Sequence, residues 1–385
     1  MQKKINVLME SESPQDGVFI NGVRAYARFC PDWILYYTKH ALFSPFPESL
    51  ASWNGDGFIY CATNRPRNAE KLEQLQKNVK TVEVFLTASN SAIGYSFKAA
   101  FAQLTDFLLE KGIHNITFFS DVDVPFIKEQ KKYVSEYVNK AGGNYVSSLN
   151  IPLEHFVQPP HWDSADDQRL MVWLKKIPKP VGILLMYEPW GQNLINACRL
   201  LHLHIPGDVA LIGLRNNAEF CESLTPTLSA CDMGMFQAGY EAARLLDLKM
   251  KGERLPKLPI VIKPVGLVER ESTERFSDDN YPIMEAITII RENAILGSGI
   301  NDVLQTLNMS RRTLERGVKK ALGRTPWQEL NRVRMEHVVR LLERTEMKLS
   351  DIAQQSGFTS PHSLNMVFKS VYGKTPLEYR RDFKK

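Results

Sequence analysis

The feature that most constrains this fold is a change in hydrophobic pattern near residue 280. Before it, short apolar runs such as residues 5–9, 116–119 and 209–214 alternate with segments of helical spacing. Buried strands that alternate with helices are typical of βαβ units, with a parallel sheet covered on both faces. After residue 283 the sequence shows only helical spacing and short turns. The pattern therefore predicts an α/β region followed by an all-α region.

The length of the chain also favours more than one domain. A chain of 385 residues exceeds the size of about 250–300 residues at which single hydrophobic cores stop growing. A polar stretch without periodicity begins at residue 271 and separates the two patterns. We expect a first domain over residues 1–273, a linker over 274–282 and a helical domain over 283–385.

The net positive charge of the chain comes from the helical part. Residues 281–385 hold 18 Lys and Arg against 11 Asp and Glu, a net charge of +7, whereas residues 1–280 hold 30 against 32, a net charge of −2. Such an asymmetry indicates a nucleic-acid-binding module joined to a neutral one.

Several other classes of protein are not supported by the sequence. The five cysteines are scattered without a C-x-x-C pair, so we expect neither a disulfide framework nor a zinc site, and a reducing cytoplasm fits best. The first apolar run is too short for a signal peptide, and no run approaches the roughly 18 apolar residues of a membrane span. The sequence contains no nucleophile elbow, Walker loop or dinucleotide fingerprint. We expect no enzymatic activity, metal, cofactor or membrane association.

The helical part contains two similar segments, residues 301–316 and 350–365. Each reads as a short helix, a tight turn and a second helix. A helix-turn-helix places its second helix in the major groove of DNA. Two such patterns in the basic part of the chain predict a DNA-binding domain.

The residues at the two turns have the chemistry that a helix-turn-helix requires. Gly357 in the second copy and Asn308 in the first are suited to the left-handed backbone that ends a helix. Ser310 and Ser360 are suited to cap the following helices, and Pro361 fits the first helical position.

The second copy and its flanks carry a family resemblance. IAQQSGF at residues 352–358, GKTP at 373–376 and GRTP at 323–326 resemble the signature of AraC-type transcription regulators, and residues 331–342 resemble their central helix. The resemblance covers about residues 283–383. Leu304, Val318 and Met366 depart from the residues usual in that family, which leaves the base preferences open.

This resemblance implies a set of DNA contacts on the two second helices. Arg can bond guanine bidentately, Glu can accept from cytosine, and an apolar group can touch the thymine methyl, while other basic side chains position the protein on phosphates. A solvated helix face remains the alternative for each residue. The implied base contacts are Arg312, Glu315 and Arg316 in the first copy and Pro361, His362, Ser363 and Met366 in the second, with phosphate contacts from Arg311 and Lys369.

The α/β part carries a second resemblance. IPGDVALIGL at residues 205–214, TPTLS at 225–229 and the segments 233–243 and 268–273 resemble LacI-type regulators, whose effector domain has a two-lobed periplasmic-binding-protein fold. The match covers about residues 4–275. It implies a type I periplasmic-binding-like domain that holds a small molecule between two lobes.

The second resemblance also implies an effector-binding set. In the family these positions follow strands, whose C-terminal ends line the ligand site. The chain departs from the family at Ser89 and Arg215, where acids are usual, and this favours an acidic or phosphorylated ligand. An Arg215 that points to solvent, or a degenerate pocket, remains the alternative. The implied effector residues are Asp16, Asn90, Glu188, Trp190, Arg215 and Asn216.

Together the two resemblances predict a cytoplasmic bacterial transcription regulator controlled by a sugar or sugar derivative. We expect double-stranded DNA, the effector and a second copy of the chain as partners, with RNA polymerase as a further candidate. The alternative is a DNA-binding scaffold whose effector pocket no longer binds anything.

Overall fold

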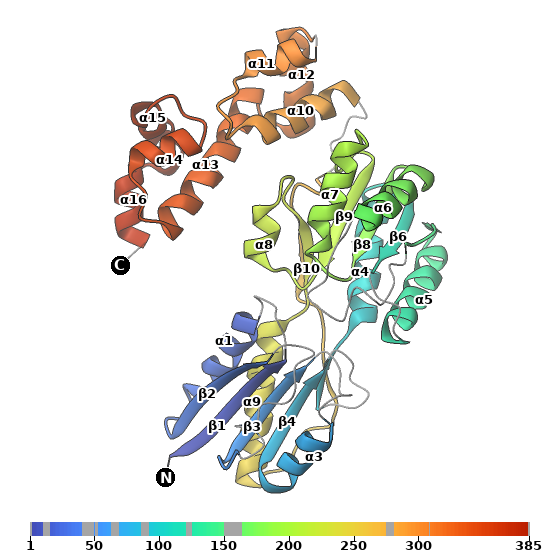
Figure 1. Ribbon diagram of the computed structural model, residues 1–385, viewed down its shortest axis with the longest axis vertical. Helices are drawn as coiled ribbons and strands as arrows, with labels where there is room; N and C mark the ends of the chain where they lie inside the picture. The colour runs from blue at the N-terminus through green and yellow to red at the C-terminus, as the bar shows by residue number, and fades with distance from the viewer. Residues whose placement is uncertain are drawn as a thin grey trace. The chain divides into compact units, whose positions relative to one another are not determined.

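The computed structural model describes residues 2–10, 16–40, 50, 53–62, 69–85, 92–120, 125–149, 164–274, 281–307 and 309–383 (Figure 1). The chain forms two compact units. The first comprises Met1–Ala197, Leu211–Ser223 and Leu228–Arg270, and the second comprises Cys198–Ala210, Leu224–Thr227 and Glu271–Lys385. The second unit therefore joins the helical C-terminal part to a small portion of the α/β region.

The first lobe of the α/β region is built on a parallel sheet with the strand order β11-β5-β4-β3-β1-β2. Its central strands are almost fully buried, since Ile5, Val7 and Ile59 have no exposed surface. This agrees with the apolar runs of the sequence. The strands are β1 (Lys3–Glu10), β2 (Trp33–His40), β3 (Gly57–Ala62), β4 (Lys80–Phe85), β5 (Ile93–Tyr95) and β11 (Ile260–Ile262).

Helices α1 (Asp16–Ala27), α3 (Ala69–Asn78) and α9 (Met235–Lys251) belong to this lobe. Helices α1 and α9 approach closely at two glycines. A Cβ on Gly22 would lie 2.1 Å from the carbonyl oxygen of Phe236, and a Cβ on Gly239 would lie 2.0 Å from that of Phe19. The crossing therefore requires glycine at both positions.

The second lobe is built on a sheet with the strand order β12-β10-β9-β8-β6-β7, in which β12 is antiparallel to β10. Every residue of β8 and β9 is buried. The strands are β6 (Asn115–Phe119), β7 (Asn144–Tyr145), β8 (Val181–Leu185), β9 (Val209–Leu214), β10 (Ser229–Asp232) and β12 (Gly266–Val268). The helices are α4 (Phe97–Glu110), α5 (Pro125–Lys140), α6 (Ser164–Lys176), α7 (Trp190–Leu200) and α8 (Ala218–Ser223).

The chain passes between the lobes at three places in the described residues. It leaves the first lobe after β5 and enters α4, which packs on the second. It returns between β10 and α9, and it crosses again between β11 and β12. Because β5 and β10 both end at a crossing, the carboxyl ends of the two parallel sheets lie at the crossings. This edge is where α/β sheets bind ligands.

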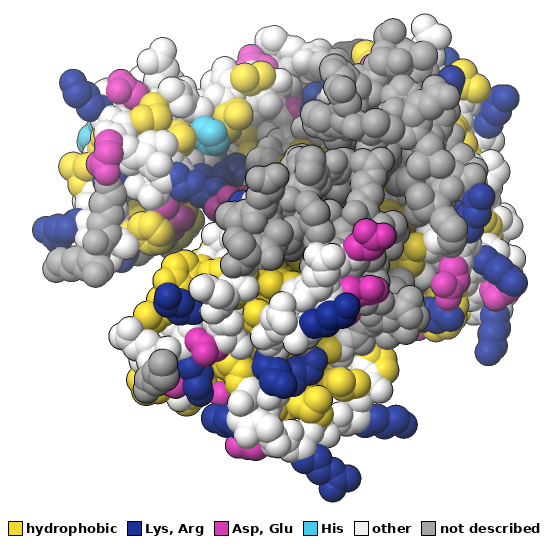
Figure 2. Space-filling model, turned by 60° about the horizontal axis from the view of Figure 1, so that its bottom comes forward, with side chains coloured by type: hydrophobic (Ala, Val, Ile, Leu, Met, Phe, Trp, Pro, Cys, Tyr) yellow, Lys and Arg dark blue, Asp and Glu magenta, His cyan; other side chains and the backbone are white. Residues whose placement is uncertain are grey.

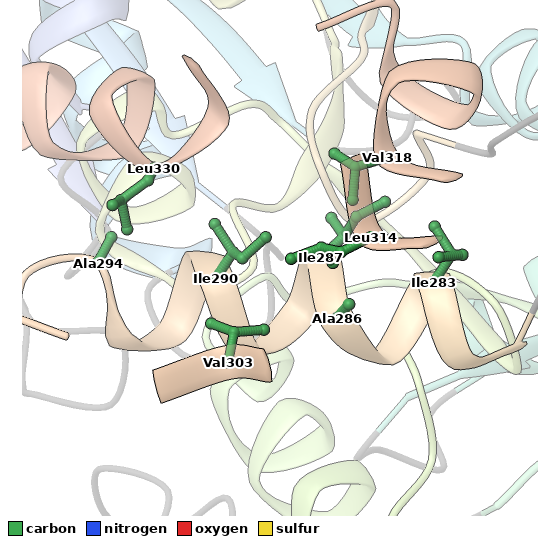
Figure 3. Close-up of a cluster of buried hydrophobic side chains, with 9 residues drawn as sticks. All are labelled: Ile283, Ala286, Ile287, Ile290, Ala294, Val303, Leu314, Val318 and Leu330. Carbon is green, nitrogen blue, oxygen red and sulfur yellow. The ribbon is translucent and has the colours of Figure 1, made fainter. Parts of the chain in front are cut away.

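The described residues of the C-terminal part form helices joined by short turns and no strand, as predicted. Two small cores stabilise it, and α13 contributes to both: Leu330 belongs to the first, and Met335 and Val338 belong to the second. Figure 3 shows the first core, in which the apolar face of α10 meets α11, α12 and α13. The helices are α10 (Tyr281–Asn293), α11 (Ile300–Thr306), α12 (Arg311–Leu322), α13 (Pro326–Arg344), α14 (Leu349–Gln355), α15 (Pro361–Tyr372) and α16 (Pro376–Phe383).

Of the expected linker over residues 274–282, the structure describes Glu274, Tyr281 and Pro282. Glu271, Ser272 and Thr273 are buried, and α10 begins at Tyr281, inside the expected linker. The carboxylates of Glu271 and Glu274 pair with arginines of α10 and α13. On the face shown in Figure 2, the coloured basic and acidic side chains are interspersed.

Candidate DNA-binding and effector-binding sites

Helix α12 is the second helix of the first helix-turn-helix, and it presents a basic face. The Ser310 hydroxyl accepts a hydrogen bond from the Thr313 amide at 3.2 Å, which is the predicted cap. Leu314 and Val318 are fully buried and hold the helix on the first core. Glu315 and Arg316, which stand between them, are exposed, so the helix is fixed by one face and exposes the other.

The predicted contact residues of α12 are all exposed. Arg311 donates to the Asn301 side chain at 2.7 Å and lies 3.6 Å from the carboxylate of Glu315. Arg312 and Arg316 have no ion pair or hydrogen bond to another described side chain. These two guanidinium groups are thus available to a base or a phosphate.

Helix α15 occupies the equivalent position in the second copy. Ser360 caps it and Pro361 stands at its first turn, as predicted. The Ser363 hydroxyl donates to the Ser360 carbonyl at 2.8 Å and accepts from the Ser360 amide at 3.2 Å. Ser363 was predicted to contact a base. In the structure its side chain is engaged in this capping box, which gives it a role in helix stability.

The remaining predicted residues of α15 face solvent. His362 and Lys369 are exposed, and 65% of the Met366 surface is accessible. An exposed methionine is suited to an apolar contact such as a thymine methyl. The backbone of Gly357 is left-handed at φ +74°, as the turn requires; Asn308, its predicted counterpart, lies outside the described residues.

A groove of about 590 Å³ opens beside the start of α12. Trp327, the second residue of α13, lines it with 58% of its surface exposed. Trp327 follows Pro326, the first residue of α13, and it is not among the residues predicted from the sequence. The groove is lined by Gly299, Ile300, Asn301, Asp302, Arg311, Glu315, Thr325, Pro326, Trp327, Leu330 and Arg334.

In the α/β region, Glu188 follows β8 at the carboxyl edge of the second sheet. The carboxylate accepts from the backbone amides of Asn216 at 2.7 Å and Asn217 at 3.1 Å, and the residue is 4% exposed. Burial raises the pKa of Glu188 to about 7, although the two amides and the charge of Arg215 act in the opposite direction. Glu188 thus fixes the loop after β9.

That loop carries two further predicted residues in an unusual backbone conformation. Arg215 has φ +90° and Asn216 has φ +55°. Residues other than glycine rarely adopt such positive φ values. The Arg215 amide donates to the Cys231 carbonyl at 2.8 Å, and the Asn216 side chain accepts from the Arg270 guanidinium at 3.0 Å. Strained residues held by several bonds are typical of functional sites.

The charge of Arg215 also acts on a residue of the first lobe. Burial raises the pKa of the Tyr95 hydroxyl well above its usual range, and the charge of Arg215 acts on this group in the opposite direction. Tyr95 ends β5, is 7% exposed and donates to the Met235 sulfur at 3.0 Å. Tyr95 thus ends β5 in the first lobe, and Arg215 follows β9 in the second.

The other predicted effector residues are less informative. Trp190 is 6% exposed, and its ring meets that of Tyr187 edge to face at 5.9 Å between centroids. Asp16 is the first residue of α1, but its side chain is outside the described part, and Asn90 lies wholly outside it. The described residues hold no group of His, Cys, Asp and Glu suited to a metal ion. None of their helices is long and apolar enough to cross a membrane.

Comparison with known families identifies both domains. Residues 105–273 match a periplasmic binding protein-like domain, and residues 303–382 match a helix-turn-helix domain. The chain is a two-domain transcription regulator. The LacI-like and AraC-like resemblances found in the sequence are thereby confirmed.

The similar proteins include regulators of xylose operons. The chain is 26% identical to the xylose operon regulatory protein of Escherichia coli K12, over 98% of this chain and 96% of that protein. It is 29% identical to the xylose operon regulatory protein of Haemophilus influenzae, over 56% of each chain.

Solved structures show the same fold. A xylose-binding transcription activator, xylR, matches with a TM-score of 0.70 and 24% identity, over 99% of this chain and 98% of that one. The regulator CcpA of Lactococcus lactis matches with a TM-score of 0.55 and 17% identity, over 71% of this chain and 99% of that one.

Proposed function

We propose that this regulator binds operator DNA through its two helix-turn-helix motifs and that a sugar or sugar derivative sets its DNA affinity. The observation that carries the proposal is the presence, in one chain, of a periplasmic-binding-type fold and two exposed second helices with correct caps. The names of its relatives refer to xylose operons, which supports a carbohydrate effector.

Binding of the effector and of DNA must influence each other reciprocally if the two sites are coupled. The ligand would shift the population between lobe arrangements that differ in DNA affinity. We further propose that the regulator acts in the cytoplasm as a homodimer, as LacI-type regulators do, and that RNA polymerase is a candidate partner at the promoter.

The chemistry of Arg215 favours an effector with an acidic group. Its guanidinium forms no ion pair with another described residue, and its backbone is fixed by the bond to Cys231 and by the Glu188 contacts to the same loop. A guanidinium presents a planar set of donors that matches a carboxylate or a phosphate. A uronic acid or a sugar phosphate would satisfy it, and a neutral pentose would not.

A thermal-shift screen tests this assignment. The wild-type protein would be tested with D-xylose and other neutral pentoses, with uronic acids and with sugar phosphates, because a ligand raises apparent stability by mass action. Arg215→Asn removes the charge and keeps a residue that tolerates the left-handed backbone. We expect an acidic sugar to stabilise the wild type and to lose about tenfold or more in affinity for the variant.

Two outcomes would contradict the proposal at different levels. A neutral pentose that stabilises both proteins equally would rule out the acidic group while leaving sugar control intact. The absence of any stabilisation by all classes of sugar would refute carbohydrate control itself.

A further inference from the structure

A buried ionic cluster lies where the α/β region meets the helical part, within the second compact unit. Glu329 of α13 has no exposed surface, and its carboxylate accepts from Arg291 of α10 at 2.6 Å and from Arg332 at 2.8 Å. Arg324 forms a further ion pair with Glu329 at 2.6 Å. The cluster thus ties the first and the fourth helices of the C-terminal part together.

Two acids from the end of the α/β region enter the same cluster. Arg332 donates to Glu271 at 2.6 Å, and Arg291 donates to Glu274 at 2.8 Å. Burial alone would raise the pKa of Glu271, but the charges of Arg291 and Arg332 outweigh it and lower that pKa. Glu271 is therefore held as a carboxylate by the DNA-binding domain.

Glu271 is bonded to the α/β region as well. Its other carboxylate oxygen accepts from the Thr227 amide at 3.0 Å, and the Ser272 amide donates to the Thr227 carbonyl at 2.9 Å. Thr227 lies two residues before β10, the strand that ends at the carboxyl edge near Arg215. One carboxylate thus bonds both parts of the unit.

Arg270, the residue before Glu271, contacts the loop after β9 that holds Arg215 and Asn216. We call this loop the effector loop. Arg270 donates to the Asn216 side chain at 3.0 Å and to the Leu228 carbonyl at 3.1 Å. Its backbone amide donates to the Ser229 hydroxyl at 2.8 Å. Consecutive residues of the chain are therefore bonded to the effector loop and to the DNA-binding domain.

We propose that the Arg270–Glu271 pair transmits effector binding to the helix-turn-helix domain. A shift of the loop that holds Asn216 moves the Arg270 guanidinium, and the adjoining Glu271 carboxylate then changes its position between Thr227 and Arg332. Because Glu271, Arg291 and Glu329 are buried, the ion pairs between them are weakly screened by salt and depend steeply on geometry. This assignment rests on the proposed function for its meaning, but its test requires no ligand.

Hydrogen exchange of the full chain, read at the Asn216 and Asn217 amides, tests the connection. These amides are bonded to Glu188 and should be protected. Arg332→Gln breaks the contact to Glu271 from the distant, DNA-binding side. Since coupling between sites corresponds to about 5-fold to 150-fold, we expect exchange at both amides to rise at least about fivefold.

A matched control lies in the same cluster. Arg324 pairs with Glu274 and Glu329, and it has no contact with Glu271 among the described residues. Arg324→Gln should therefore leave the Asn216 and Asn217 amides unchanged. Arg332→Lys, which keeps the charge and loses the planar set of donors, serves as a milder variant should the glutamine variant fail to fold.

A double-mutant comparison distinguishes an effect passed through Arg270 from a general destabilisation of the protein. With Arg270→Gln in place, the added effect of Arg332→Gln on the two amides should vanish, since interaction energies appear between residues that share a network. The proposal is overturned if Arg332→Gln leaves both amides unchanged, if Arg324→Gln speeds them equally, or if the effect persists without Arg270. None of these results depends on whether the effector is a sugar.

Discussion

Replacing Glu329 by glutamine should loosen the DNA-binding domain more than any exposed charge change on the same helix. The carboxylate is fully buried and is bonded to arginines from α10 and α13. Glutamine keeps the shape and removes the charge, so the surrounding guanidinium groups lose their shared partner. Removing one member of a buried ion pair is costly because the other charge remains desolvated.

The stabilisation that the Glu329 carboxylate contributes follows from its pKa. Burial alone would raise this pKa, but the hydrogen bond from Arg332 and the charges of Arg291, Arg332 and Arg324 lower it from 4.5 to about 2. A difference of this size corresponds to about 3 kcal/mol, at 1.36 kcal/mol for each pKa unit. Because the folded-state pKa is the lower one, this stabilisation is complete above about pH 4.5 and is lost as the pH falls toward 2.

Native-state hydrogen exchange of α13 amides at pH 7 measures the effect without requiring that the two units unfold together. We expect roughly hundredfold faster exchange in Glu329→Gln. Glu336→Gln is the control, because Glu336 also accepts from Arg332 at 2.6 Å but is 49% exposed, and exposed pairs contribute at most about 1 kcal/mol. Equal exchange in the two variants, or a change below threefold in Glu329→Gln, would refute the reasoning.

Three further predictions follow from single sites. Gly357→Ala should destabilise the second helix-turn-helix by about 1–3 kcal/mol in urea unfolding, since φ is +74° and a Cβ would lie 2.3 Å from a backbone carbonyl; Gly373→Ala, with φ +72° and open space, should cost less. Neutralising Arg312 and Arg316 together should weaken binding to a promoter fragment at least about tenfold by fluorescence anisotropy, and an unchanged affinity would remove both from the interface. The folded-state pKa of Glu188 is about 7, above the unfolded value, so stability should fall as pH rises from about 4.5 to 7, by up to about 3 kcal/mol. Glu188→Gln should abolish that fall, and an identical pH profile in the variant would contradict it.

The parts of the fold that depend on local chemistry could be predicted from the sequence. Ser310, Ser360 and Pro361 are found at the predicted caps, and Gly357 adopts the predicted left-handed backbone. Strand β9 has the predicted limits, because a run that is buried along its whole length leaves no ambiguity. Caps and buried strands are readable since a few neighbouring residues determine them.

Features that depend on distant partners could not be predicted. Glu271 stands at the start of a polar stretch without periodicity, and its partners Thr227 and Arg332 are 44 and 61 residues away in the sequence. Glu188 was predicted near the ligand, yet two backbone amides from another loop occupy its oxygens. Trp327 was missed because the exposure of an aromatic ring is set by tertiary packing.

The most direct test of the central claim is the affinity of the full chain for its own promoter DNA, measured by fluorescence anisotropy with and without the sugar that gives the largest thermal shift. Coupled sites should change each other's affinity by about 5-fold to 150-fold, equally in both directions. We predict a change of at least fivefold with the wild-type protein. A sugar that stabilises the protein and leaves the DNA affinity unchanged would contradict control of DNA binding by the effector.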